Sequence, residues 1–253
     1  MAHILATDYG KRVLLVDLDP SGNLSASFGL RPQKAGPRDE TLYGCAALLH
    51  QADADVKEYI VSTKTPGVDL IPTNDSMKQA DTFLRATSTP QPYKLRRHLN
   101  QVQEDYDFCI LDCPHHEDLV VFNALVAARE VIAPATVGQD AMDGTVRAFL
   151  WIQEDVDEYN PSLVFRGVLK TKIGVNNLDK EGAETPIRIP GTGKVIPQFK
   201  TYIRSSVDAE RCRFMCMALK EYSKSMKPAI DYDNFVAEYL GLPPVHTKNV
   251  PYL

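Results

Sequence analysis

Three aspartates at the ends of two apolar runs are the residues most able to do chemistry in this chain. Asp17 and Asp19 follow the apolar run 13–16, and Asp112 follows the run 108–111. If the two runs form neighbouring strands of a parallel sheet, their carboxylates meet along one edge. This geometry suits Mg²⁺ held through water, together with a carboxylate that orients an attacking water at a phosphate. The alternative is that the aspartates only cap the turns or helices that follow.

A phosphate-binding loop is missing from where such a site needs one. In nucleotide-hydrolysing α/β proteins, a strand of this kind lies beside a glycine-rich loop that ends in Gly-Lys-Ser/Thr. Only twelve residues precede Val13, too few for that loop and its strand. The run Gly191-Thr-Gly-Lys194 resembles part of such a loop, but Val195 and a short strand are expected after it. Because the helix N-terminus that binds phosphate is absent there, we do not expect 191–194 to replace the loop.

The elements that must position these residues alternate between strands and helices. Helical patterns of 10–20 residues between apolar strands predict an α/β fold with a mostly parallel, twisted sheet and helices on both faces. No repeat or low-complexity linker divides the sequence, so we expect a single domain over residues 1–253. The expected strands are 13–18, 67–74, 106–112, 130–135, 163–172 and 195–198. The expected helices are 3–9, 76–86, 94–102, 123–128, 139–158, 206–226 and 231–240, with a loop over 174–195.

Composition limits the classes of function. A net charge of −5 and a pI of about 5.7 give the whole protein no basic signature for nucleic acid. Between Lys170 and Lys220, however, ten Lys or Arg face five acids, which allows a local anion-binding surface. No apolar run reaches the length of a membrane span, and the first residues lack the pattern of a signal peptide.

The five cysteines are few and odd in number, which indicates a reducing cytoplasm. Cys109 and Cys113 lie at a strand end, and Cys212 and Cys216 are four residues apart on an expected helix. A metal or redox site is one interpretation of these pairs. Buried thiols that act as small hydrophobic residues are the other, and we favour it.

Several segments resemble, in order, the ParA/MinD/Soj family of deviant-Walker-A partition ATPases. Residues 10–25 (GKRVLLVDLDPSGNLS) are similar to the family's switch I, and residues 106–114 (YDFCILDCP) to its Walker B strand and the start of switch II. The agreement continues nearly to the end of the chain, through 122–134, 160–163, 166–169, 195–197 and 203–206.

The resemblance implies a P-loop NTPase fold of the SIMIBI type, that is, an AAA-type (CbiA-like) nucleotide-binding domain. It implies ATP and Mg²⁺ as cofactors, a homodimer in the nucleotide-bound state, non-specific DNA binding and a ParB-like partner that stimulates hydrolysis. It also implies a cytoplasmic, nucleoid-associated protein. The C-terminus lacks the basic amphipathic helix of the MinD branch, so the ParA/Soj branch without a membrane partner is favoured.

The resemblance also implies roles for individual residues. Asp19 would orient the attacking water, and Asp112 would hold Mg²⁺ through water. Asp17 would support switch I, which Pro20, Gly22 and Asn23 would shape around the nucleotide. Pro197 would lie near the adenine base. Arg204 would contact DNA. Lys200 is a further candidate because it lies near Arg204 in the sequence, and Lys170 and Lys172 could add phosphate contacts; the alternative is a solvated basic surface.

The chain departs from the family pattern in three places. The deviant Walker A loop, Lys-Gly-Gly-x-Gly-Lys-Thr, is absent, and by family spacing it would end a few residues before Met1. Its strand, which lies beside the Walker B strand, is absent with it, as in an N-terminally truncated domain. Switch II reads Asp112-Cys-Pro-His115-His116-Glu117-Asp118 in place of Asp-x-Pro-Pro, and we expect the histidines to form an exposed polar loop. The segment 174–194 is longer and more polar than in the family.

Two functions remain open from the sequence. The first is an ATPase of plasmid or chromosome partition whose chain, as given, is catalytically incompetent because the P-loop is absent. The second is a non-catalytic relative that binds DNA or a partner protein without hydrolysing ATP. A redox or metal protein that uses the cysteines is the third and least favoured.

Overall fold

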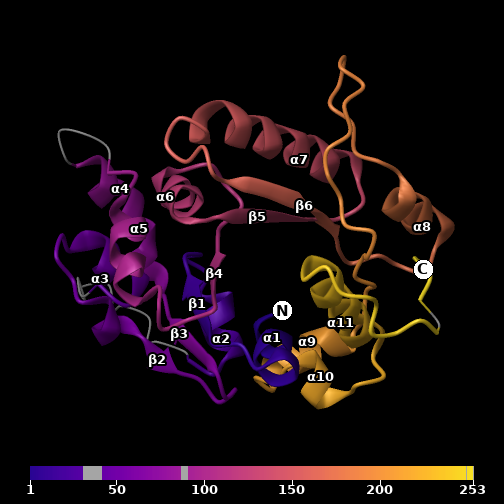
Figure 1. The fold of residues 1–253 in the computed structure, drawn as a ribbon, viewed down its shortest axis with the longest axis horizontal. Helices are drawn as coiled ribbons and strands as arrows, with labels where there is room; N and C mark the ends of the chain where they lie inside the picture. The colour runs from indigo at the N-terminus through magenta and orange to yellow at the C-terminus, as the bar shows by residue number, and fades with distance from the viewer. Residues whose placement is uncertain (31–41, 87–90, 249, 253) are drawn as a thin grey trace. The chain divides into compact units, whose positions relative to one another are not determined.

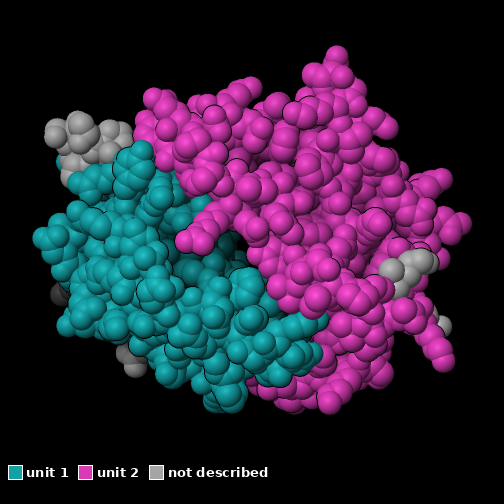
Figure 2. Space-filling view, in the orientation of Figure 1, with its two compact units in different colours: residues 1–128 teal, residues 129–253 magenta. Residues whose placement is uncertain are grey.

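The computed structural model describes residues 1–30, 42–86, 91–248 and 250–252 (Figure 1). The chain divides into two compact units, residues 1–128 and residues 129–253, which Figure 2 shows in different colours. Each unit has its own sheet and its own helices, and each is described by itself.

The first unit contains a four-stranded sheet in the order β2-β3-β1-β4. The central strand β1 pairs in parallel with β3 on one side and with β4 on the other, so the expected mostly parallel sheet is confirmed. The short β2 was not expected and runs antiparallel to β3. All five residues of β1 are buried, which explains its unbroken apolar run. The strands are β1 (Val13–Asp17), β2 (Val61–Ser62), β3 (Val68–Ile71) and β4 (Phe108–Asp112).

Helices cover both faces of this sheet. Leu14 and Val16 point into a core that also contains Leu48 and Leu95, whereas α1 packs on β1 and β3 from the other face. Gly10 ends α1 with a φ of 62°, so the predicted helix at 3–9 and its glycine stop are confirmed. The helices are α1 (Ala2–Tyr9), α2 (Asn23–Ser27), α3 (Cys45–His50), α4 (Ala80–Arg85), α5 (Lys94–Leu99) and α6 (Leu119–Ala127). Short 3₁₀ turns are η1 (Val56–Tyr59), η2 (Asp75–Gln79) and η3 (Asn100–Val102).

Strand β4 is the last strand of this sheet within the described residues. Its side chains are more open than those of β1, and Cys109 and the following Cys113 are exposed. The expectation of buried thiols is therefore wrong for these two cysteines. It is confirmed for Cys212, which is buried.

The second unit is built on two parallel strands, β5 (Glu130–Ala135) and β6 (Val164–Lys170). Helix α7 (Gln139–Trp151) packs on β5, and Val146 and Phe149 join Val168 in the core. The π-helical turn η4 (Ile152–Val156) continues α7, so the expected helix at 139–158 is confirmed with a change of winding near its end. The remaining helices are α8 (Asn177–Glu184), α9 (Asp208–Phe214), α10 (Leu219–Tyr222) and α11 (Lys227–Tyr239).

Three expectations for this unit are wrong. Helix α8 lies inside the segment expected to be a loop, and none of its residues is buried, so no apolar period marks it. Its signal is Asn176, whose side chain accepts a hydrogen bond from the Asp179 amide and caps the helix. The helix expected over 206–226 is two short helices, because the chain turns at Cys216, where φ is 50°. The strand expected at 195–198 forms only isolated bridges.

No helix within the described parts of the chain is both long and apolar enough to cross a membrane.

Candidate functional site

The first unit brings the predicted carboxylates of β1 and β4 together. Asp17 and Asp112 are register partners in the parallel pairing of the two strands. Just beyond them, the Leu18 amide donates a hydrogen bond to the Asp112 carbonyl oxygen at 2.9 Å. Asp19 follows within two residues, and its negative charge also acts on Asp112. The expected meeting of carboxylates along one sheet edge is therefore observed.

Asp17 is the buried member of this group, with none of its surface exposed. Its Oδ2 accepts from the Ser25 amide at 2.8 Å and from the Ser25 hydroxyl at 2.6 Å, and its Oδ1 accepts from the Asp19 amide at 3.2 Å. Burial raises the pKa of Asp17 from its ordinary value, and the bonds from Ser25 act in the opposite direction. Ser25 in turn accepts from the Thr73 amide at 3.0 Å. Asp17 therefore joins β1, α2 and the end of β3.

Asp19 opens a tight turn that leads into α2. Its carbonyl oxygen accepts from the Gly22 amide at 2.9 Å, and its Oδ1 accepts from the Ser21 amide at 2.8 Å. Gly22 has a φ of 61°, and a Cβ there would meet the Thr73 carbonyl oxygen at 3.4 Å. Asn23, the first residue of α2, donates from its side-chain amide to the Ser21 hydroxyl at 2.9 Å. The segment that the resemblance identified as switch I is thus a hydrogen-bonded turn with a half-buried carboxylate.

Asp112 has the most perturbed carboxylate of the three. Loss of water contact, followed by the negative charges of Asp17 and Asp19, raises the pKa of Asp112 to about 6. A cation beside these groups would favour the ionised form of Asp112.

These carboxylates fit Mg²⁺ held mainly by water and phosphate, and not by a protein cage. Within the described residues there is no group of three or more His, Cys, Asp or Glu side chains able to hold a metal ion. Asp17 is buried and already accepts three hydrogen bonds, whereas Asp112 is exposed, so Asp112 is the more accessible of these two carboxylates to an ion. Mg²⁺ in phosphate-transfer sites commonly keeps several waters and takes one or two carboxylates.

The histidine-containing segment after β4 is an exposed polar loop, as predicted. His115 and His116 are exposed, and their rings meet edge-on with 5.8 Å between centroids. His116 Nε2 lies 2.9 Å from Asp118, and Asp118 caps α6 by accepting from the Val121 amide at 2.8 Å. The loop is therefore fixed at its far end by the start of α6.

The three remaining predicted site residues lie in the second unit. Pro197 is exposed, and its carbonyl oxygen accepts from the Val168 amide at 2.9 Å. Gly167 permits this approach, since a Cβ there would meet the Pro197 carbonyl oxygen at 3.3 Å. Lys200 is exposed, and its amide donates to Glu238 at 2.8 Å.

Arg204 is held inside the fold by Asp231. Its Nε and Nη2 donate to the Asp231 carboxylate at 2.9 and 2.7 Å, and its amide donates at 2.9 Å. The Arg204 side chain is 14% exposed and that of Asp231 is fully buried. Tyr252 adds a further bond to Asp231 at 2.9 Å. Arg204 thus has a structural role on the face where a contact to DNA is predicted.

Lys170 does not belong to an exposed basic face. It is buried, and its ammonium group donates to the carbonyl oxygens of Gly182 and Ala183 at 3.0 and 2.9 Å. Burial lowers its pKa. Lys170 therefore satisfies the last carbonyls of α8, and the expectation that it contacts phosphates is wrong.

The run 191–194 lies at the turn of a hairpin-like loop. The bridge between Arg188 and Val195 is antiparallel, and the Ile189 amide donates to the Lys194 carbonyl oxygen at 2.9 Å. No helix begins after it, as the sequence predicts, so the run has no helix N-terminus for a phosphate.

The sequence did not reveal the residues that hydrogen-bond to Asp17 and Arg204. Ser25 and Thr73 complete the surroundings of Asp17, and Asp231 holds Arg204. Ser25 offered a signal, because a hydroxyl eight residues after a buried aspartate can cap it across a tight turn. Asp231 offered none, since 27 residues separate it from Arg204.

Comparison with known proteins finds relatives of this chain by family model and by sequence. A family model described as an AAA domain (AAA_31) matches residues 1–165. The sporulation initiation inhibitor protein Soj of Bacillus subtilis (strain 168) is 31% identical over 198 residues, which cover 78% of this chain and 70% of Soj. The chromosome partitioning protein ParA of Caulobacter vibrioides (strain NA1000 / CB15N) is 29% identical over 181 residues, or 71% of this chain and 65% of that ParA. The matches span about two thirds of each relative.

Solved structures share the fold. Cobyrinic acid a,c-diamide synthase from Mycobacterium smegmatis, with a bound ATP analogue and magnesium, has 30% identity and a TM-score of 0.64, covering 90% of this chain and 89% of that one. An ATP complex of a McdA variant from Cyanothece has a TM-score of 0.74 and covers 97% of this chain and 92% of that one. At 19% identity, the likeness to McdA concerns the fold alone.

Proposed function

This chain belongs to the ParA/MinD/Soj family of partition ATPases, and we propose that it supplies the switch I and Walker B parts of a ParA/Soj-type Mg-ATP site. The observation that carries the proposal is the register pairing of Asp17 with Asp112, with Asp19 in the turn that follows. The fold and the relatives support it.

The three carboxylates would have different roles in the Mg-ATP site. Asp112, whose pKa is raised by its surroundings, would face Mg²⁺ through water. Asp17 would hold the turn in place through Ser25, and Asp19 would accept a hydrogen bond from the attacking water. Pro20, Gly22 and Asn23 would shape this turn beside the nucleotide. Mg²⁺, when bound, would neutralise charge that develops on the phosphates.

Further parts of the proposal concern the second unit and the assembly. Pro197 would lie near the adenine base, and Lys200 with Arg204 would contribute to non-specific DNA binding. Residues 1–253 would act as one nucleotide-binding domain that forms a homodimer with ATP and meets a ParB-like partner at the nucleoid in the cytoplasm. The relatives named Soj and ParA support this functional class.

The 253 residues contain no Gly-Lys-Ser/Thr loop that leads into a helix, so we propose that they do not turn over ATP by themselves. The test compares them with a longer chain that includes the residues encoded directly upstream of Met1. If Lys-Gly-Gly-x-Gly-Lys-Thr is present there in frame, the longer chain should release phosphate from Mg-ATP. Asp19→Ala should abolish this release, and the exposed control Asp53→Ala should not. Magnesium-dependent release by the 253 residues alone, lost in Asp19→Ala, would contradict the proposal.

A second candidate is a non-catalytic relative that binds DNA or a partner protein. An upstream stop codon, together with salt-sensitive DNA binding by the 253-residue chain, would favour this candidate. DNA binding that is absent even at low salt would exclude its DNA-binding form.

A further inference from the structure

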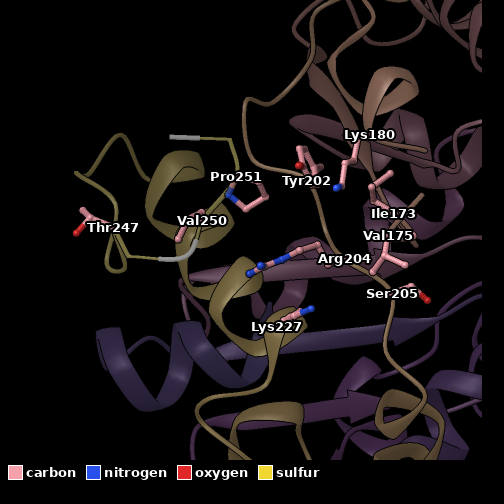
Figure 3. Close-up of a pocket in the computed structure, with 11 residues that line it drawn as sticks. Ile173, Val175, Lys180, Tyr202, Arg204, Ser205, Lys227, Thr247, Val250 and Pro251 are labelled. Atoms are coloured by element: carbon pink, nitrogen blue, oxygen red, sulfur yellow. The ribbon is translucent and has the colours of Figure 1, made fainter. Parts of the chain in front are cut away.

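The second unit contains a pocket that the predicted nucleotide site does not use. It has a volume of about 520 Å³, within the usual range for small-molecule sites. Figure 3 shows its walls, which come from the segment after β6, from α8, from the chain around Tyr202 and Arg204, from the start of α11 and from Thr247, Val250 and Pro251 near the C-terminus. None of Asp17, Asp19 and Asp112 belongs to it.

The charge of the pocket is positive. Lys180, Arg204 and Lys227 line it, and no aspartate or glutamate does. The charge of Arg204 is already paired with the buried carboxylate of Asp231. In the part of the chain that the structure describes, neither Lys180 nor Lys227 has a carboxylate within ion-pair distance. Two uncompensated ammonium groups that share one pocket indicate an anionic ligand.

The rest of the lining is suited to an organic molecule. Ile173 and Val250 are buried at the wall, and Val175 is 81% exposed at the pocket. Tyr202, Ser205 and Thr247, which carry hydroxyl groups, also line the pocket. An apolar wall with a few convergent polar groups is the usual composition of a small-molecule site.

The walls are held in place by bonds outside the pocket. The Ser205 amide donates to the Ile173 carbonyl oxygen at 2.8 Å, which joins two of the walls. The C-terminal wall is fixed to α11, because His246 bonds to Asn234 and Tyr252 bonds to Asp231. The pocket lies where the chain leaves the carboxyl end of β6, and α/β proteins bind ligands at such ends.

We propose that this pocket binds a small phosphate-bearing molecule. Its phosphate lies between Lys180 and Lys227, near the guanidinium group of Arg204. Its organic part rests on Val175, Val250 and Pro251.

The test measures binding by titration calorimetry of the full chain in EDTA, so that no divalent ion bridges the ligand to the carboxylates of the first unit. The probes are AMP and inorganic phosphate. We expect both to bind and AMP to bind more tightly, because only AMP reaches the apolar wall. Lys180→Gln and Lys227→Gln should each weaken both ligands about tenfold, since each removes one charged contact.

Lys224→Gln is the matched control, because Lys224 is exposed three residues before Lys227 and does not line the pocket. It should bind both probes as the unchanged protein does. Equal affinity for AMP and phosphate would overturn the assignment of the apolar wall.

A short DNA duplex, followed by fluorescence anisotropy, separates a small ligand from a nucleic-acid backbone. Loss of duplex binding in the Lys180 and Lys227 variants, with no measurable binding of either small probe, would overturn the proposal in favour of a DNA surface. Binding of AMP that neither lysine variant weakens would also overturn it. These outcomes are independent of ATP turnover, which depends on Asp19.

Discussion

Asp17 and Asp112 are register partners across β1 and β4, and the charge of Asp17 contributes to the raised pKa of Asp112. The pairing places a fully buried, hydrogen-bonded carboxylate beside a more open one. The first is committed to structure through Ser25, and the second is available to a cation.

The raised pKa of Asp112 predicts how stability depends on pH. A folded-state pKa of about 6 exceeds the ordinary value of 3.8, so the folded chain holds this proton more tightly. Protonated Asp112 therefore stabilises the folded chain below pH 4, and this contribution to the free energy of unfolding is lost as the pH rises through 6. Asp112→Asn should therefore stabilise the chain more at pH 7.5 than at pH 4. We expect the gain in the free energy of unfolding to be about 1 kcal/mol larger at pH 7.5, less than the full pKa shift implies because Asp112 is exposed to water. Urea unfolding at the two pH values measures it, and Asp53→Asn, at an exposed site, should show no such difference.

Ser25→Ala should destabilise the first unit. It removes the 2.6 Å bond to Asp17 and the acceptor for the Thr73 amide, and it leaves both partners buried. We expect a loss of about 2 kcal/mol in urea unfolding. Ser27→Ala, which removes only a bond to a carbonyl oxygen in the same helix, should cost less than about 0.5 kcal/mol. Equal losses in the two variants would contradict the importance of the Asp17 network.

Arg204→Ala should destabilise the chain by about 3 kcal/mol, because it leaves Asp231 buried without its charge partner. Lys200→Ala should leave stability nearly unchanged, since only the Lys200 backbone is bonded to Glu238. Thermal unfolding checks both. Loss of DNA binding in Arg204→Ala is therefore informative only if the variant is folded, whereas Lys200→Ala tests DNA contact without this complication. A fully stable Arg204→Ala protein would contradict the assigned structural role.

Gly44→Ala should be among the most destabilising single changes in the first unit. Gly44 has a φ of 52°, and a Cβ there would lie 1.9 Å from the Pro72 carbonyl oxygen. We expect a loss of about 3 kcal/mol or more, because the backbone of Pro72 must move. Gly10→Ala is the control. Its φ is 62° but nothing lies within 4 Å of the added Cβ, so only about 1 kcal/mol of conformational strain should appear in urea unfolding.

The sequence predicts the parts of the fold that a continuous apolar run or a glycine stop marks. The apolar run predicts β1, Gly10 marks the end of α1, and β5 has the predicted bounds. Helix α8 was missed because it buries nothing, and its only local signal is the Asn176 cap. The break between α9 and α10 was missed because a positive φ at Cys216 has no sequence signature.

The same limit applies to the site. Asp17, Asp19 and Asp112 follow apolar runs, so strand pairing alone brings them together. The partner of Arg204 depends on how α11 packs against a distant segment, and no spacing rule connects Arg204 with Asp231. The exposure of Cys109 and Cys113 likewise depends on tertiary packing, which the residues next to them in the sequence do not reveal.

The attachment of Tyr252 to Asp231 affects how the protein is best handled. An affinity tag fused after residue 253 begins close to Tyr252, a side chain that supports the Arg204 ion pair. Displacement of Tyr252 would remove one hydrogen bond from the buried Asp231 carboxylate. A tag or label is better attached at the exposed position 53, which does not line the pocket.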